Sequence, residues 1–151
     1  MLDFDGVLTD NAVWVSDDGA ELVRCDRSDS LGLAMLARAG IAAMVLSTET
    51  HPVVAARCRK LNVPCVQGVS DKGTTLASVL AERGVDPARV AYVGNDVNDL
   101  DCLALVGVPV AVADAHPRVL DAASIVLSRP GGHGAVRELC ELVLDAAQVA
   151  P

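Results

Sequence analysis

The chain has 151 residues, of which 52% are hydrophobic and 21% are charged, and its formal net charge is −8. This length suits one domain, and the composition argues against a disordered chain. Nucleic-acid phosphates require a basic surface, so the acidic charge argues against a nucleic-acid partner. The apolar runs are too short to span a membrane, and the N-terminus shows no signal-peptide pattern.

The cysteines give little support for a metal or disulfide framework. Their number is odd, and no spacing suits zinc: Cys25, Cys58, Cys65, Cys102 and Cys140. We expect reduced, buried thiols in a cytoplasmic protein, because a reducing compartment keeps thiols from pairing. Only two residues precede Asp3, which is short for a strand and leaves open that a longer chain precedes Met1.

Short apolar runs alternate with helical patterns along the chain. The runs are continuously apolar, as in strands that are buried on both faces of a parallel sheet. The sequence therefore predicts a single three-layer α/β/α domain over residues 1–151, with a Rossmann-like parallel sheet. The expected strands are 41–47, 90–94, 108–112 and 124–128, and the expected helices are 29–40, 51–62, 70–84, 96–107 and 134–147.

Residues 12–25 interrupt this alternation. Two strand-like stretches, 12–16 and 20–25, flank an Asp18-Gly19 pair that is typical of a hairpin turn. Because an isolated hairpin is marginal in water, this one must pack on something. It carries Trp14, the only tryptophan of the chain, and we expect a partner subunit to cover it.

Three carboxylates, Asp3, Asp5 and Asp10, surround Gly6 in the N-terminal stretch LDFDGVLTD. Like charges in one site raise one another's pKa and cost stability, which a chain usually tolerates where a cation binds. Mg²⁺ takes oxygen ligands and keeps several waters, so it fits such a group. We expect Asp3 and Asp5 to belong to a Mg²⁺ site, whereas Asp10 either supports that site or caps the loop.

Other polar clusters also follow strands or open helices. Ser47-Thr48-Glu49 ends the run at 41–47, the stretch GNDVND (94–99) follows the run at 90–93, and Lys72 opens a helix. Ligands of open α/β sheets bind at the carboxyl ends of the strands. We therefore expect these clusters and the N-terminal carboxylates to form one site.

These residue types suit phosphoryl transfer, which needs positioning and charge neutralisation. Asp3 can bind the metal with one oxygen and attack phosphorus with the other. Asp5 can donate a proton to the leaving oxygen and later activate water. Ser47 and nearby N–H groups can hold a phosphate oxygen, and Lys72 would neutralise phosphate and carboxylates. Two carboxylates would complete or support the metal shell: Asp96 and Asp99.

The pattern resembles the haloacid dehalogenase-like (HAD) phosphatases, which carry DxDG, then Ser or Thr, then Lys, then GDxxxD. The chain matches at Asp3-Phe4-Asp5-Gly6, Ser47, Lys72 and 94–99. The stretches VAVADAHP and GGHGAVRE resemble one capless branch, whose members act on 2-keto-3-deoxy sugar acid phosphates. The resemblance implies a HAD core without a cap domain, Mg²⁺-dependent hydrolysis through an aspartyl-phosphate, and a homotetramer with its hairpins joined at the centre.

The resemblance also suggests which residues bind phosphate and sugar. Ser47-Thr48-Glu49 replaces the Thr-Gly-Arg that is usual in octulosonate phosphatases, and Glu49 with Lys60 resembles the branch that acts on nine-carbon acids. His133 lies where relatives often carry an Arg that reaches the substrate. The implied phosphate- and substrate-binding residues are Gly6, Ser47, Thr48, Glu49, Lys60 and His133.

One departure from the family pattern concerns the metal. The family's main ligand in its last motif is the Asp after Gly94, and this chain has Asn95 there. An amide oxygen can bind Mg²⁺ but brings no charge, so we expect weaker metal binding, with Asp96 able to take over in a shifted geometry.

Two rival interpretations remain at this point. Asn95 and the abrupt N-terminus would suit a non-catalytic or weakly active oligomerisation domain of an acylneuraminate cytidylyltransferase. A phosphorylation receiver domain also combines a carboxylate cluster with a Lys, but the early hairpin and the second carboxylate set argue against it.

Overall fold

The computed structural model describes residues 1–149, which form an α/β domain. The strands are β1 (Thr9–Val15), β2 (Glu21–Cys25), β3 (Val45–Leu46), β4 (Cys65–Val66), β5 (Ala91–Gly94), β6 (Val108–Ala111) and β7 (Ile125–Val126). The helices are α1 (Arg27–Arg38), α2 (Val53–Leu61), α3 (Lys72–Glu82), α4 (Leu100–Leu105), α5 (Pro117–Ala122) and α6 (Ala135–Val149), with 3-10 turns at Pro87–Arg89 and Val97–Asp99.

The N-terminal residues lie at the centre of the parallel sheet. Leu2 forms parallel bridges with Val45 of β3 and Val93 of β5, and so joins the β3–β4 pair to the β5–β6–β7 sheet. The Leu2 carbonyl accepts a hydrogen bond from the Leu46 N–H at 2.9 Å, and the Asp3 N–H donates to the Val93 carbonyl at 3.0 Å. Asp3 therefore leaves the sheet at its middle, where neighbouring strands can supply other site residues.

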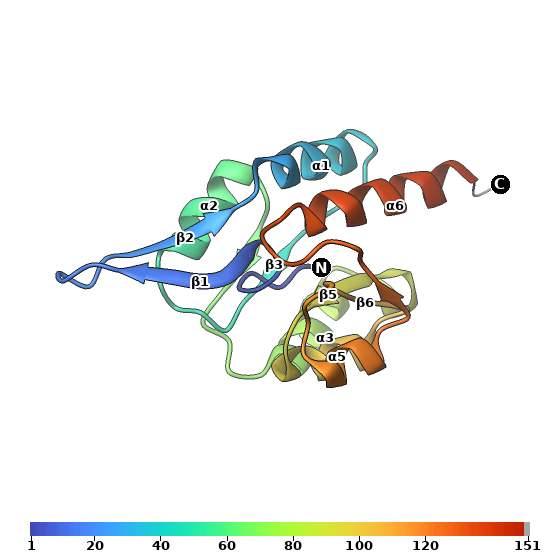
Figure 1. The fold of residues 1–151 in the computed structure, drawn as a ribbon. Coiled ribbons are helices and arrows are strands. Elements are labelled where there is room, and N and C mark those ends of the chain that lie inside the picture. Colours follow the sequence, from blue (N-terminus) through green and yellow to red (C-terminus); the bar gives the residue numbers. More distant parts are fainter. Residues whose placement is uncertain (150–151) are drawn as a thin grey trace.

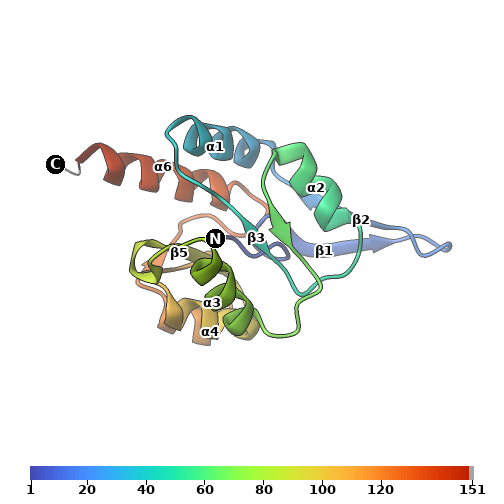
Figure 2. The ribbon, with the colours of Figure 1, turned by 180° about the vertical axis from the view of Figure 1, so that it is seen from behind.

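Helices cover both faces of this sheet. Helices α1, α2 and α6 lie on one face, and α3, α4 and α5 lie on the other (Figures 1 and 2). The predicted three-layer architecture is confirmed, and no cap domain is inserted between residues 1 and 149. None of the helices in this range is long and apolar enough to cross a membrane.

Several elements differ from the sequence prediction. The strand expected at 41–47 is only Val45–Leu46, because the Ile41 N–H still bonds to the Leu36 carbonyl at the end of α1. The two-residue strand β4 and the six-residue helix α5 were not predicted. Two residues cannot show the alternation of a strand, and six residues span less than two turns of a helix, so periodicity gives no signal for β4 and α5.

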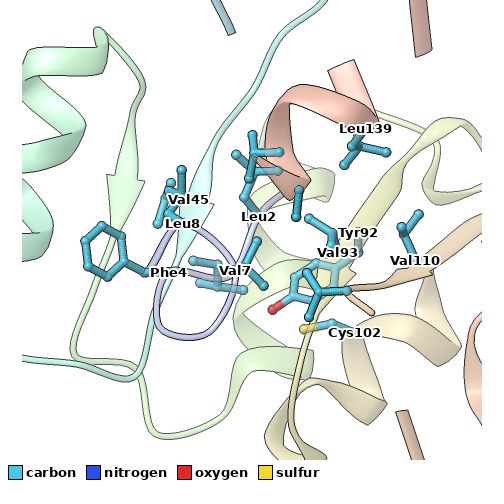
Figure 3. Packing of buried hydrophobic residues seen from close by; sticks show 14 of the residues in the cluster. Leu2, Phe4, Val7, Leu8, Val45, Tyr92, Val93, Cys102, Val110 and Leu139 are labelled. Atoms are coloured by element: carbon cyan, nitrogen blue, oxygen red, sulfur yellow. The ribbon is translucent and has the colours of Figure 1, made fainter. Parts of the chain in front are cut away.

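The loop after Asp3 is anchored by its own apolar residues. The side chains of Phe4, Val7 and Leu8 are buried in the same cluster as Leu2 and Val93 (Figure 3). Each buried aliphatic or aromatic side chain contributes about 1.5–3 kcal/mol relative to exposure. The polar residues between them are therefore held on a fixed backbone.

The predicted hairpin is present, with its first strand beginning at Thr9 and extending to Val15. Strands β1 and β2 pair antiparallel with a bulge between Thr9 and Val13, and the ribbon projects away from the layers (Figure 1). Gly19 closes the turn with a φ of 83° and an N–H bond to the Ser16 carbonyl. Four apolar side chains are exposed on the hairpin: Val13, Trp14, Val15 and Leu22.

Asp29 connects α1 to α6. Its Oδ1 accepts a hydrogen bond from the Arg137 N–H at 2.9 Å, while its buried Oδ2 has no partner among residues 1–149. Burial raises the pKa of Asp29 to about 6, against the opposing effect of the Arg137 hydrogen bond. The folded state therefore holds this proton more tightly than the unfolded state, so the contribution of Asp29 to stability falls as the pH rises from about 4 to about 6.

Asp29→Asn removes this titration and keeps an oxygen for the Arg137 N–H. Relative to the wild type, we expect the variant's free energy of unfolding to rise by on the order of 3 kcal/mol between about pH 4 and pH 7. Urea unfolding across this range measures the difference. Asp121→Asn on the exposed side of α5 is the control and should follow the wild type; a parallel profile for Asp29→Asn would contradict the assignment.

Candidate active site

A buried lysine joins the first and last polar clusters of the sequence. The Lys72 Nζ, at the start of α3, lies 2.7 Å from Asp3 Oδ1 and 2.8 Å from Asp99 Oδ1. All three side chains are at least nine-tenths buried. Breaking such a pair leaves an uncompensated buried charge and costs about 3–5 kcal/mol, so each residue depends on the others.

Both carboxylate oxygens of Asp99 accept hydrogen bonds from neighbouring groups. Its Oδ1 accepts from Lys72 and from the Tyr92 hydroxyl at 2.7 Å, and its Oδ2 accepts from the Asn95 N–H at 2.9 Å and the Asp96 N–H at 3.3 Å. Asp99 therefore holds Lys72 and the turn after β5 in place. Nothing in this geometry directs it toward the pocket, unlike the metal-ligand role that the sequence suggested.

The protonation states of Asp3 and Lys72 depend on each other. Burial, followed by the Asp99 carboxylate, raises the pKa of Asp3 to about 7, and Lys72 only partly offsets this. Burial alone would lower the pKa of Lys72, but the two carboxylates outweigh it and raise that pKa. The lysine is thus a fixed cation at the base of the site.

Asp3 presents its second oxygen to a pocket. Its Oδ1 accepts from Lys72 and from the Phe4 N–H at 2.7 Å, whereas its Oδ2 has no hydrogen-bond or ion-pair partner in the described part of the chain. The pocket has a volume of about 190 Å³. Its lining consists of Asp3, Asp5, Asn11, Thr48, Asn95, Asp96, Val97 and Asn98.

Asp5 shares this pocket and is half-buried. Burial, followed by the charge of Glu49, raises the pKa of Asp5. The loop closes because the Gly6 N–H donates to Thr9 Oγ1 at 3.1 Å. Gly6 has a φ of 78°, and a Cβ there would lie 1.9 Å from Asn95 Nδ2, so glycine is what leaves room for the Asn95 side chain.

The Ser47–Glu49 segment lies beside the pocket, and Thr48 is the residue of this segment that lines it. Ser47 is buried, and its Oγ accepts from the Glu49 N–H at 3.1 Å. Glu49 Oε1 accepts from the N–H groups of Thr50 and His51, and these bonds, with that of His51 the larger, lower the Glu49 pKa. Lys60 is exposed near the far end of α2 and does not line the pocket.

His133 lies behind the loop rather than in the pocket. Its ring contacts Arg24 Nη1 at 3.2 Å, and Arg24 also donates to the Gly132 carbonyl at 2.8 Å and lies 3.6 Å from Asp10. Asp10 therefore pairs with Arg24 at the base of the hairpin, which favours its role as a support of the loop. Within a single chain, His133 also supports the loop, through its contact with Arg24.

Sequence reasoning missed three pocket residues and one buried partner. Asn11, Val97 and Asn98 line the pocket, and Tyr92 holds Asp99 from beneath. Asn98 lies inside the GNDVND stretch, so its position in that motif was an available signal. Asn11 and Tyr92 have no comparable signal, because their roles depend on a bulge and on packing.

The pocket suits Mg²⁺ because its lining is acidic and rich in oxygen atoms. The residues from 1 to 149 contain no group of three His, Cys, Asp or Glu side chains arranged to hold a metal. The polar side chains that line the pocket carry oxygen atoms, among them the carboxylates of Asp3, Asp5 and Asp96 and the amide of Asn95. A cation that prefers oxygen and keeps several waters fits this set.

Comparison with known proteins identifies the family. Residues 60–139 match the haloacid dehalogenase-like hydrolases, and the 3-deoxy-D-manno-octulosonate 8-phosphate phosphatase of Salmonella typhi is 37% identical over 147 residues. That alignment covers 97% of this chain and 78% of the relative. The chain belongs to the haloacid dehalogenase-like hydrolases.

Solved HAD structures share the whole fold. A protein of Streptomyces avermitilis described as a HAD family hydrolase is 51% identical, with a TM-score of 0.93 over 97% of this chain and 84% of that chain. The 3-deoxy-D-manno-octulosonate 8-phosphate phosphatase of Moraxella catarrhalis, solved with magnesium, phosphate and KDO, is 30% identical, with a TM-score of 0.93 over 96% of this chain and 84% of that chain.

Asp99→Asn separates an organising role from a ligand role in this HAD site. The variant puts an NH₂ group against backbone donors and weakens the hold on Lys72, so we expect the metal-free protein to lose about 3–5 kcal/mol of unfolding free energy. Chemical denaturation in EDTA measures this loss.

The control is Asp96→Asn, because Asp96 is exposed and an amide oxygen can still cap the Val97 N–H. We expect its stability to change by less than about 0.5 kcal/mol. If metal-free Asp99→Asn is as stable as the wild type or more stable, Asp99 is not the organising residue.

Proposed function

We propose that this HAD hydrolase is a Mg²⁺-dependent phosphatase that hydrolyses the phosphomonoester of a 2-keto-3-deoxy sugar acid. The substrate class is of the KDO-8-phosphate or nonulosonate-9-phosphate type. The observation that carries the proposal is the asymmetry of Asp3, with one oxygen fixed by Lys72 and the other open to an oxygen-lined pocket. The substrate and metal of the relatives' names support it.

Asp3 is the nucleophile in this proposal. Its Oδ2 attacks phosphorus, the bond from phosphorus to the sugar oxygen breaks, and an aspartyl-phosphate forms on Asp3. Lys72 holds the other carboxylate oxygen, so the attacking oxygen is oriented before substrate arrives. Mg²⁺ would be held by the Asn95 amide, Asp96 and a main-chain oxygen of Asp5, and would neutralise charge on the phosphoryl oxygens.

Asp5 is the general acid and then the general base in this proposal. Its raised pKa favours the protonated form that can donate to the departing sugar oxygen. As a carboxylate it then takes a proton from the water that attacks the aspartyl-phosphate. That attack breaks the bond between phosphorus and Asp3, releases inorganic phosphate and restores the Asp3 carboxylate. Ser47 and the N–H group of Thr48 are the candidates for holding the phosphate.

The proposal includes a homotetramer in the cytoplasm. Trp14 and Leu22 are 55% and 68% exposed on a hairpin that projects from the domain, so assembly would bury an apolar surface that one chain leaves in water. The family resemblance implies hairpins joined at the centre of a tetramer. All five cysteines are free thiols, which suits a reducing compartment.

A second candidate function is assembly without turnover. Asn95 favours it, because an uncharged ligand weakens the attraction for Mg²⁺ that phosphoryl transfer requires. In that case the exposed hairpin would be the functional surface, and the domain would hold together copies of a larger protein.

Asp3→Asn decides between the two candidates. Phosphate release is measured with millimolar Mg²⁺ over eight- and nine-carbon sugar acid phosphates and simple sugar phosphates. We expect wild-type turnover that is highest on a sugar acid phosphate, and a loss of at least about 1,000-fold in the variant, because the nucleophile is gone.

Asp121→Asn is the matched control and should retain wild-type turnover, because Asp121 is exposed on α5. Sedimentation of the same samples should give a tetramer in all three proteins. A folded wild-type tetramer without turnover on any substrate would favour the assembly function, and turnover that survives Asp3→Asn would refute the nucleophile assignment.

A further inference from the structure

Asn11 has an unusual backbone conformation at the edge of the active-site pocket. Its φ is 63°, within the left-handed region that non-glycine residues rarely adopt. It lies in the β-bulge between Thr9 and Val13, its side chain is exposed, and it lines the pocket that contains Asp3 and Asp5. Such conformations persist where the surrounding structure enforces them, often at functional sites.

The catalytic loop itself enforces this conformation. Thr9 Oγ1 accepts hydrogen bonds from the Asn11 N–H at 3.2 Å and from the Gly6 N–H at 3.1 Å. One hydroxyl therefore ties Asn11 to the turn that carries Asp5. The backbone from which the Asn11 side chain projects consequently has a set position relative to the reacting carboxylates.

The outer lining of the pocket is chemically different from its base. Asn11, Thr48 and Asn98 contribute neutral side chains that have no hydrogen-bond partner among the described residues. We call these three residues the rim. Carboxamides and hydroxyls both donate and accept hydrogen bonds, so they match sugar hydroxyls, whereas the acidic base suits a metal cation.

We propose that the rim recognises the hydroxyl groups of the substrate next to its phosphate, and that Asn11 is a specificity-determining residue. This inference rests on the proposed phosphatase function and identifies which part of the sugar acid is recognised by residues of a single protein chain. The rim has no cation, so it selects a polyhydroxylated chain and not a carboxylate. A phosphate ester without hydroxyls would leave the rim amides paired with water alone.

The positive φ of Asn11 is itself a structural reason for an asparagine at this position, and the test must separate it from substrate recognition. A bulge that needs a positive φ accepts Gly or Asn, because these residues tolerate the left-handed region best. Asn62 shows that structural use: with a φ of 55° it caps α2, and it lines a separate cleft between α2 and β4. Asn62 is therefore a matched control for the backbone effect.

The test compares Asn11→Gly with Asn62→Gly. Glycine keeps the positive φ in both variants and removes only the side chain. Kinetics are measured on a 2-keto-3-deoxy sugar acid phosphate and on p-nitrophenyl phosphate, which has no sugar hydroxyls. We expect Asn11→Gly to lower the ratio of the two kcat/KM values by about 3- to 10-fold, mainly through KM on the sugar substrate, as loss of one neutral hydrogen bond implies.

Asn62→Gly should leave that ratio at the wild-type value. An equal loss on both substrates in Asn11→Gly, or no change on either, would overturn the inference. Calorimetric binding of the dephosphorylated sugar acid gives a readout that needs no turnover, and Asn11→Gly should weaken it about 3- to 10-fold. An absence of turnover in the wild type would refute the proposed function. Separately, an Asn11→Gly affinity for the sugar acid equal to that of the wild type would refute the role of the rim.

Discussion

The site depends on one buried cation, Lys72, placed between two buried carboxylates. Burial, and then the repulsion between the two acids, favours their neutral forms and raises the pKa of Asp3. The lysine makes it possible for Asp3 to remain close to Asp99, and Asp99 in turn is held by Tyr92 and by two N–H groups after β5. The ion pairs thus connect three segments that are far apart in sequence: the N-terminus, the start of α3 and the 3-10 turn after β5.

This arrangement explains why the reactive oxygen needs no further support. The central position of Leu2 in the sheet fixes where Asp3 emerges, and the buried Phe4, Val7 and Leu8 fix the loop that follows. Orientation is therefore established by the core before any ligand binds, which is how positioning lowers the barrier of phosphoryl transfer. The pocket is acidic, but Asn95 is neutral. The base of the pocket therefore offers a metal less negative charge than it would with an aspartate at this position.

Much of the architecture was readable from the sequence, because continuous apolar runs followed by helical patterns specify a covered parallel sheet. The hairpin followed from Asp18-Gly19, and the strand-end rule brought Asp3, Lys72 and Asp99 into one site. The distribution of tasks within the site was not readable. Asp99 was expected to complete or support the metal shell, and in the structure its acceptors are used by Lys72, Tyr92 and the backbone. Asn11 escaped notice because a β-bulge, which no local pattern encodes, turns it toward the pocket. The metal and substrate roles of the individual residues stay predictions.

The account makes its central claim about one atom, Asp3 Oδ2, and a trapping experiment tests that atom directly. The wild-type protein is acid-quenched during turnover of a sugar acid phosphate with Mg²⁺, and the denatured chain is reduced with borohydride, which converts an aspartyl-phosphate to homoserine. Mass spectrometry of the N-terminal peptide then shows which carboxylate carried phosphate. The account predicts homoserine at residue 3 and unmodified aspartate at residue 5. Homoserine at another position, or none anywhere while phosphate is being released, would contradict it.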